Sequence, residues 1–154
     1  MKVTFSVAEI PPKKDGASSM WNKAQEVPRL IALRQAALTA RQQAGLTQAL
    51  ETFVKLDVEI FIPRHRVEVV GDLDNFLTGI CDGLQAADPK AFWHPQFDRP
   101  ELQDVHPRHA ILLKNDSLVI AINAKKVPVP VEAQVTYIVS VEELVSPNDW
   151  EMTM

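Results

Sequence analysis

The chain of 154 residues has little of several features that would define its class. A single cysteine, Cys81, excludes an internal disulfide and a cysteine-rich zinc site, and its place in an apolar helical pattern predicts an inert core thiol. No apolar run approaches the roughly 18 residues that span a bilayer, and the opening MKVTFSVAEIPPKK is too interrupted for a secretory signal. We therefore expect a cytoplasmic protein with no membrane partner.

An excess of basic residues is also missing. The formal net charge is −4, with ten basic and seven acidic side chains in residues 1–70 against six and thirteen in residues 71–154. A nucleic-acid-binding domain usually has a positive net charge, so composition alone argues against a nucleic-acid partner. Five acids lie after residue 131 with no base among them, which predicts a solvated acidic C-terminal tail: Glu132, Glu142, Glu143, Asp149 and Glu151.

What the chain does have is the composition and patterning of one globular domain, with 46% hydrophobic residues. Residues 54–62 alternate strictly between apolar and polar side chains, which predicts a strand with one buried face. Proline-rich and aromatic-rich residues 88–111 predict a long ordered loop. The remaining patterns predict strands at 2–8, 117–126 and 131–141, and helices at 28–44 and 74–87. Together they predict an α+β fold in a single domain, with a mixed sheet of about four strands and two main helices packed on it.

The segment GDLDNFLTGICDGLQ, residues 71–85, places Asp72 and Asp74 at the start of the second predicted helix. Each acid has a plain structural explanation, with Asp74 as an N-cap and Asp116, in LKNDSL, as a turn residue. However, side chains alternate in an extended segment, so both carboxylates of the pair would point at one site. Like charges so close favour a bound cation such as Mg²⁺. We expect the three acids to meet at one end of the sheet.

Other residues have both a structural and a functional interpretation. Two glycines in the second helix, Gly79 and Gly83, suggest close packing. The loop histidines His106 and His109 are expected at the surface rather than on a metal. Six bases could track phosphates if folding brings them beside the acids: Lys13, Lys14, Arg64, Arg66, Lys125 and Lys126. Trp21 and Trp93 could stack on unpaired bases, although core positions are the simpler explanation for both.

Three segments resemble RusA-like Holliday junction resolvases. DLDNFLTGICDGL resembles the family signature, in which an Asp-Leu-Asp-Asn run opens a helix. LDVEIFIP with the following RHR is similar to the strand and arginine-rich approach that precede it, and NDSLVIAINAKKVPV is similar to the second motif, an acid followed by a strand and a lysine. The resemblance covers residues 54–87 and 112–128, with residues 88–111 as an apparent insertion.

Members of that family are small dimeric nucleases that need Mg²⁺ and cut four-way DNA junctions. The resemblance therefore implies a homodimeric, structure-selective endodeoxyribonuclease of recombination and repair that hydrolyses phosphodiesters in branched DNA. It further implies that Asp72, Asp74 and Asp116 bind the metal, Mg²⁺ or Mn²⁺, and act as the catalytic residues, and that Lys126 contacts phosphate.

The sequence departs from the family pattern at two positions. Thr78 stands where the family has a functionally important lysine, and Asn115 stands where a second acid is usual. A neutral threonine does not supply the charge that a lysine would place on phosphate. A non-catalytic relative that binds DNA or protein and has kept the fold therefore remains the alternative.

Overall fold

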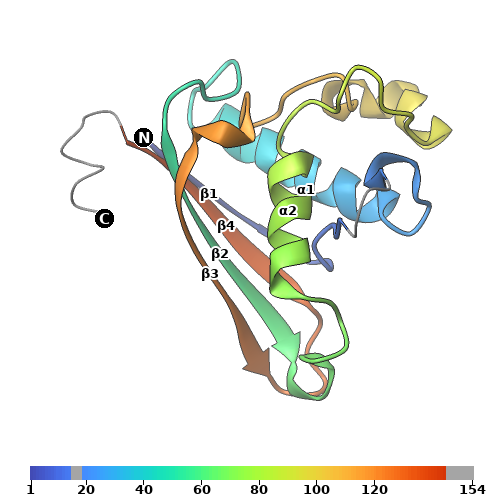
Figure 1. The fold of residues 1–154 in the computed structure, drawn as a ribbon, viewed down its shortest axis with the longest axis vertical. Helices are drawn as coiled ribbons and strands as arrows, with labels where there is room; N and C mark the ends of the chain where they lie inside the picture. The colour runs from blue at the N-terminus through green and yellow to red at the C-terminus, as the bar shows by residue number, and fades with distance from the viewer. Residues whose placement is uncertain (15–18, 145–154) are drawn as a thin grey trace.

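The computed structural model describes residues 1–14 and 19–144, so Asp149 and Glu151 of the predicted acidic tail lie outside the described residues. Six main elements follow one another along the chain: β1 (Lys2–Val7), α1 (Val27–Gln43), β2 (Val54–Pro63), α2 (Leu73–Gly83), β3 (Val119–Val129) and β4 (Thr136–Glu143). They form one four-stranded sheet with both α-helices packed on the same face (Figure 1). No helix within these residues has the length and apolar character needed to cross a membrane.

The sheet is mixed, with strand order β1-β4-β2-β3. β2 runs parallel to β3, whereas β4 runs antiparallel to both of its neighbours, β1 and β2. The strict alternation of β2 predicts its environment correctly, because Val54, Leu56, Val58, Ile60 and Ile62 are all buried beneath the helices. The predicted α+β domain with a four-stranded mixed sheet and two helices is confirmed.

The second predicted helix ends earlier than expected, at Gly83 instead of residue 87. The carbonyl of Leu84 accepts hydrogen bonds from the N–H groups of Ile111, Leu112 and Leu113, at 3.0–3.2 Å. The buried Arg34 guanidinium binds the Gly83 carbonyl at 2.7 Å and that of Gln85 at 2.8 Å. These tertiary partners replace the helical hydrogen bonds of the next turn, so the helix cannot continue.

The last two strands are displaced toward the C-terminus relative to the prediction. Residues 116–118 form a 3₁₀ turn, and β3 continues through Val129 because residues 126–129 pair with residues 60–63 of β2. The predicted linker VPVP therefore belongs mostly to the strand, and β4 starts only at Thr136. The loop at 88–111 is ordered as predicted, but it contains two short 3₁₀ helices, Pro95–Asp98 and Pro100–Val105.

The two glycines of α2 do pack closely, as predicted. Gly79 lies against the backbone of Pro12, and an added Cβ would overlap the Pro12 carbonyl oxygen. At Gly83 an added Cβ would lie 2.7 Å from Cδ2 of Leu33, the end of a flexible side chain in α1. The Pro12 backbone cannot move aside for an added Cβ at Gly79, whereas the Leu33 side chain can move aside for one at Gly83.

We expect Gly79→Ala to lower the free energy of unfolding by about 1–3 kcal/mol, the usual effect of overpacking. Gly83→Ala is the control, because it makes the same change at the last residue of the same helix, where the added Cβ meets a side chain that can move. Urea unfolding of both variants measures the difference. Equal stabilities would show that the Pro12 backbone does not need the glycine.

Candidate metal and nucleic-acid site

The turn into α2 depends on Gly71. Its φ of +150° is a backbone conformation that favours glycine, and an added Cβ would lie 2.7 Å from the ring of Phe76. β3 braces this turn, because Nζ of Lys126 donates to the carbonyls of Gly71 at 2.6 Å and Val67 at 2.9 Å. The turn therefore delivers Asp72 to the start of the helix in a fixed position.

Asp72, not Asp74, is the N-cap residue of α2. Its side chain makes no capping hydrogen bond, although its backbone carbonyl accepts the first helical bond from the N–H of Phe76 at 3.1 Å. Asp74 already lies in the first helical turn, so the expected alternation of the two acids along an extended segment is wrong. Both residues are exposed at the positive, N-terminal end of the helix dipole. Because the Asp72 side chain makes no capping hydrogen bond, capping does not explain why an acid stands at this position.

Asp116 lies at the other end of α2. Its N–H donates to Oε1 of Gln85 at 3.0 Å, just beyond the helix, and from Asp74 to Leu84 a helix rises about 15 Å. The expectation that the three acids meet at one end of the sheet is therefore wrong within one chain. β2 and β3 are parallel, so α2 must run back between them, and its start and the start of β3 lie at opposite ends. Within residues 1–14 and 19–144, no three His, Cys, Asp or Glu side chains are placed to hold a metal ion.

Four of the six predicted phosphate-binding residues lie in, or in contact with, the segment that leads from β2 into α2. Arg64 and Arg66 form the 3₁₀ turn that follows β2, Lys126 braces Gly71, and the side chain of Lys13 packs beside Gly71. We call this region the α2 entrance: Lys13, residues 64–74 and Lys126. It also contains one further exposed acid, Glu68.

The other two predicted bases lie elsewhere. Nζ of Lys14 pairs with Asp82 at 2.9 Å, two turns further along α2. Lys125 lies on the sheet face opposite the helices, where its Nζ is 3.8 Å from a carboxylate oxygen of Glu59. The structure therefore groups Lys13, Arg64, Arg66 and Lys126 with the acid pair, and separates Lys14 and Lys125 from it.

The two residues that depart from the resolvase pattern both have local structural roles. Thr78 is exposed one turn beyond Asp74, and its Oγ1 donates to the Asp74 carbonyl at 3.0 Å. Asn115 caps the 3₁₀ turn at the start of β3, with its Oδ1 accepting from the N–H of Ser117 at 2.9 Å. Neither side chain places charge at the α2 entrance.

Cys81 lies partly buried on α2, packed against the core. Burial, and to a smaller extent the carboxylates of Asp82 and Asp116, raise the pKa of its thiol to about 11. The thiol is therefore protonated at neutral pH and unreactive, in agreement with the sequence prediction.

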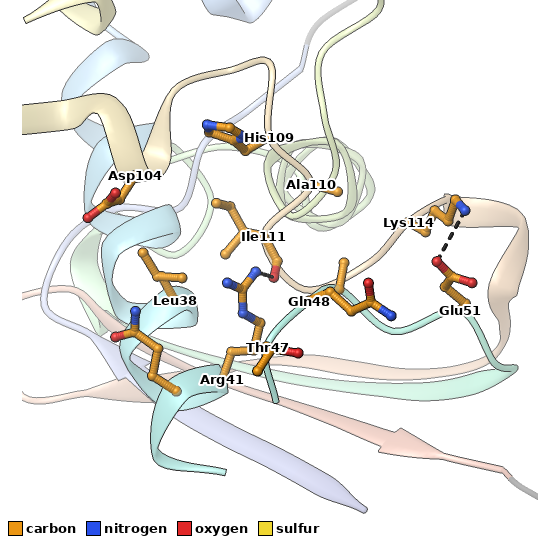
Figure 2. A pocket seen from close by; sticks show the side chains of 12 residues that line it. Leu38, Arg41, Thr47, Gln48, Glu51, Asp104, His109, Ala110, Ile111 and Lys114 are labelled. Carbon is orange, nitrogen blue, oxygen red and sulfur yellow. Dashed lines mark hydrogen bonds and ion pairs between the residues drawn. The ribbon is translucent and has the colours of Figure 1, made fainter. Parts of the chain in front are cut away.

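A pocket of about 470 Å³ lies away from the α2 entrance, beside the second half of α1 (Figure 2). Nη1 of Arg41 donates to the Ile111 carbonyl at 2.8 Å, and Lys114 pairs with Glu51 at 3.1 Å. With Asp104 also in the lining, the pocket holds charges of both signs. Sequence reasoning missed it because its residues come from three distant segments and form no motif.

Sequence reasoning also missed Arg34, which organises the loop at 88–111. Arg34 is fully buried in α1, at helical spacing from the core residues Leu30 and Ala37, and burial lowers its pKa to about 9, so it remains charged at neutral pH. Its guanidinium donates at 2.6–2.8 Å to five backbone carbonyls: Gly83, Gln85, Val105, His106 and His109. A charge inside an apolar helical stripe was the signal that could have revealed it.

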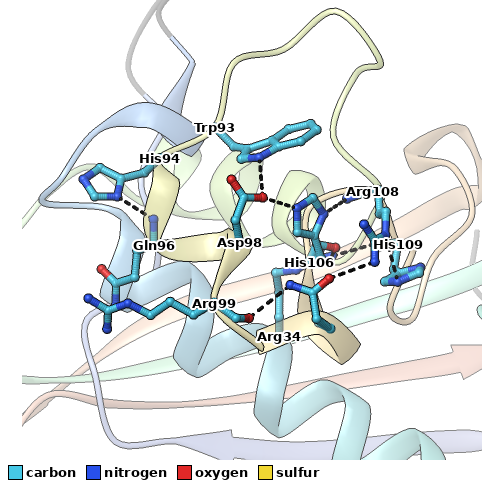
Figure 3. Close-up of polar contacts among 10 residues, drawn as sticks. Arg34, Trp93, His94, Gln96, Asp98, Arg99, His106, Arg108 and His109 are labelled. Atoms are coloured by element: carbon cyan, nitrogen blue, oxygen red, sulfur yellow. Dashed lines mark hydrogen bonds and ion pairs between the residues drawn. The ribbon is translucent and has the colours of Figure 1, made fainter. Parts of the chain in front are cut away.

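The loop residues around Arg34 form a second polar network (Figure 3). Nε2 of His106 lies 2.9 Å from Oδ1 of Asp98, the same oxygen that accepts from Nε1 of Trp93 at 3.2 Å, and the His106 hydrogen bond is the main reason that the pKa of Asp98 is lowered. His106 is buried, so its expected surface position is wrong, whereas His109 is exposed as expected. Trp21 is buried against Phe97 with ring centroids 5.9 Å apart, a core anchor that is not available to stack on a base.

Compared with known proteins, the chain matches no protein-family model and no curated protein.

Proposed function

We propose that the protein is a metal-dependent, structure-selective endodeoxyribonuclease that hydrolyses phosphodiesters in branched DNA, with Mg²⁺ or Mn²⁺, as a cytoplasmic homodimer. The observation that carries the proposal is the α2 entrance, where two exposed acids, Asp72 and Asp74, lie among four bases. The bases are Lys13, Arg64, Arg66 and Lys126. Holliday junction resolution in recombination and repair is the specific activity that the resolvase resemblance adds.

The mixture of charges suits a phosphodiester substrate. Arg64 and Arg66 follow β2 on a short 3₁₀ turn, so their guanidinium groups can fix the register of a DNA backbone without reading its sequence. Lys126 is anchored by two backbone carbonyls, which keeps a fixed positive charge beside the acid pair. These residues would offset the chain's overall acidity at the one place where phosphate has to approach.

Asp72 and Asp74 supply two of the ligands that a divalent cation would need. Mg²⁺ in proteins commonly binds one or two carboxylates and keeps several waters, and Asp72 and Asp74 are exposed with no cap bond made by the Asp72 side chain. Mg²⁺ bound there would activate a water nucleophile and neutralise charge on the scissile phosphate. Asp116 does not belong to this set within one chain.

We expect purified protein to cut a labelled four-way junction in Mg²⁺, and to leave both the junction in EDTA and a linear duplex of the same sequence uncut. Product lengths on a denaturing gel measure cutting, and the linear duplex controls for a contaminating nuclease. A junction that stays intact in both Mg²⁺ and Mn²⁺ would contradict the proposal.

The second candidate is a non-catalytic DNA- or protein-binding relative. Two observations favour it: Asp116 lies far from Asp72 and Asp74 in one chain, and neutral Thr78 stands one turn above Asp74. This candidate predicts a junction that is retarded in a native gel but never cut with either metal. The cutting assay therefore separates the two candidates directly.

A further inference from the structure

The pocket beside the second half of α1 has no role in the proposed nuclease activity. Its other walls come from residues 47–51 and 104–114 (Figure 2). Two main-chain hydrogen bonds hold these walls together, from the N–H of Leu50 to the Leu112 carbonyl at 2.9 Å and from the N–H of Lys114 to the Leu50 carbonyl at 3.1 Å. At about 470 Å³ the pocket has the size of a small-molecule site, and its shape does not depend on a ligand.

Arg41 reaches this pocket with most of its hydrogen-bonding capacity unused. Within the part of the chain that the structure describes, its side chain makes one hydrogen bond, from Nη1 to the Ile111 carbonyl at 2.8 Å, and pairs with no carboxylate. Its Nε is enclosed and has no partner, whereas Arg34 in the same helix donates to five carbonyls. A place in the last turn of α1 suits a positive charge but does not explain the unused donors.

The unused edge of Arg41 has the geometry of a carboxylate site. Nε–H and Nη2–H lie side by side on a planar guanidinium, and such a fork binds the two oxygens of a carboxylate through parallel hydrogen bonds. Lysine would supply charge at this position without the fork. The pocket wall therefore presents a group that recognises a carboxylate in preference to a neutral molecule.

Asp104 is the complementary group in the same pocket. It is exposed, and it makes no hydrogen bond or ion pair with any residue that the structure describes. In the view of Figure 2, Leu38 lies between Asp104 and Arg41. Two opposite charges thus line one pocket without pairing with each other, which leaves each of them for a ligand.

The other charged groups of the lining balance one another. Lys114 pairs with Glu51 at 3.1 Å, and both are exposed. The pKa of His109 is lowered, chiefly by desolvation, so the imidazole is neutral at neutral pH. Two positive and two negative side chains therefore give the lining no net charge. A phosphate group would bring only negative charge toward the two acids, whereas a ligand with one carboxylate and one ammonium group matches the lining.

We propose that this pocket binds a small zwitterion, a free amino acid or a short peptide with charged termini, whose carboxylate binds the unused edge of Arg41 and whose ammonium group binds Asp104. Thr47 and Gln48 supply polar contacts for the rest of the ligand, and Leu38 supplies an apolar one. The pocket lies away from the α2 entrance, so this binding site stands or fails separately from the nuclease activity.

Calorimetric titration of the wild-type protein tests the class of ligand. The probes are free L-amino acids and dipeptides, each added alone at millimolar concentration, with inorganic phosphate as the purely anionic comparison. At least one zwitterion should bind saturably and raise the melting temperature, and whether it is an amino acid or a dipeptide distinguishes the two sources. Its methyl ester, without the carboxylate charge, and its N-acetyl derivative, without the ammonium charge, should each bind at least about tenfold more weakly. No binding of any zwitterion, or tighter binding of phosphate, would overturn the proposal.

Two variants test where the ligand binds. Arg41→Met and Asp104→Asn should each weaken binding of the best probe by at least about tenfold. Arg99→Met and Glu101→Gln are the matched controls, because both residues are exposed and lie outside the pocket lining, and they should bind as the wild type does. Arg41→Lys keeps the charge without the fork and should bind with intermediate affinity, which gives a second variant if Arg41→Met does not fold. Wild-type affinity in folded Arg41→Met or Arg41→Lys would overturn the proposed site.

Discussion

Asp74→Asn should reduce cutting of a four-way junction by at least about 100-fold, equivalent to about 2.7 kcal/mol in the activation free energy. Asparagine keeps the shape of the side chain but removes the negative charge that a bound cation needs. The helix should persist, because Asp72 and not Asp74 is the N-cap, and Asp74 contributes only the interaction with the helix dipole, about 0.3–1 kcal/mol. Single-turnover rates in Mg²⁺ measure the effect.

Junction binding by the same variant should persist or tighten, since one negative charge fewer faces the phosphates. Asp82→Asn is the matched control, because Asp82 lies on the same helix, pairs with Lys14 and is outside the α2 entrance. We expect this control to cut at close to the wild-type rate. Full activity in Asp74→Asn would show that the active site is elsewhere.

Arg34→Met should lower the free energy of unfolding by about 4 kcal/mol, because several of its five carbonyl partners would lose a hydrogen bond in the protein interior. Methionine fills most of the space without supplying a donor. Arg41→Met is the matched control in the same helix. Arg41 donates to a single carbonyl, that of Ile111, so this substitution should lower the free energy of unfolding by about 1 kcal/mol. Urea unfolding followed by tryptophan fluorescence measures both.

Arg34→Lys provides a variant that keeps the charge if Arg34→Met does not fold. An ammonium has three donors and cannot span five carbonyls, so we expect a stability between those of the wild type and Arg34→Met. If Arg34→Met proves as stable as Arg41→Met, the Arg34 contacts contribute no more than one ordinary hydrogen bond, and the loop at 88–111 is held by other contacts.

Patterns within a single element were readable from the sequence. The alternation in 54–62 identified β2 and its buried face, and the apolar spacing of α1 and α2 located both helices to within a few residues. These predictions succeed because one face of each element must be buried, and burial has a fixed period in the sequence.

Features that depend on distant segments were not readable in the same way. The end of α2 is set by the Leu84 carbonyl, whose partners come from residues 111–113, and the length of β3 is set by its register with β2. The separation of Asp116 from Asp74 follows from the parallel direction of β2 and β3, which the order of elements does not specify. Of the candidate site, the sequence pointed to three acids and six bases, but it did not predict that Asp116, Lys14 and Lys125 lie apart from Asp72 and Asp74.

The contacts of Arg34 are made entirely to main-chain oxygens, and every amino acid has one. The side chains at positions 83, 85, 105, 106 and 109 could therefore be exchanged without removing any of these acceptors, provided that the backbone keeps its path. Lengthening or shortening the chain between them would move the carbonyls out of reach. Selection acting through Arg34 would thus tolerate substitutions in this part of the protein and reject insertions and deletions.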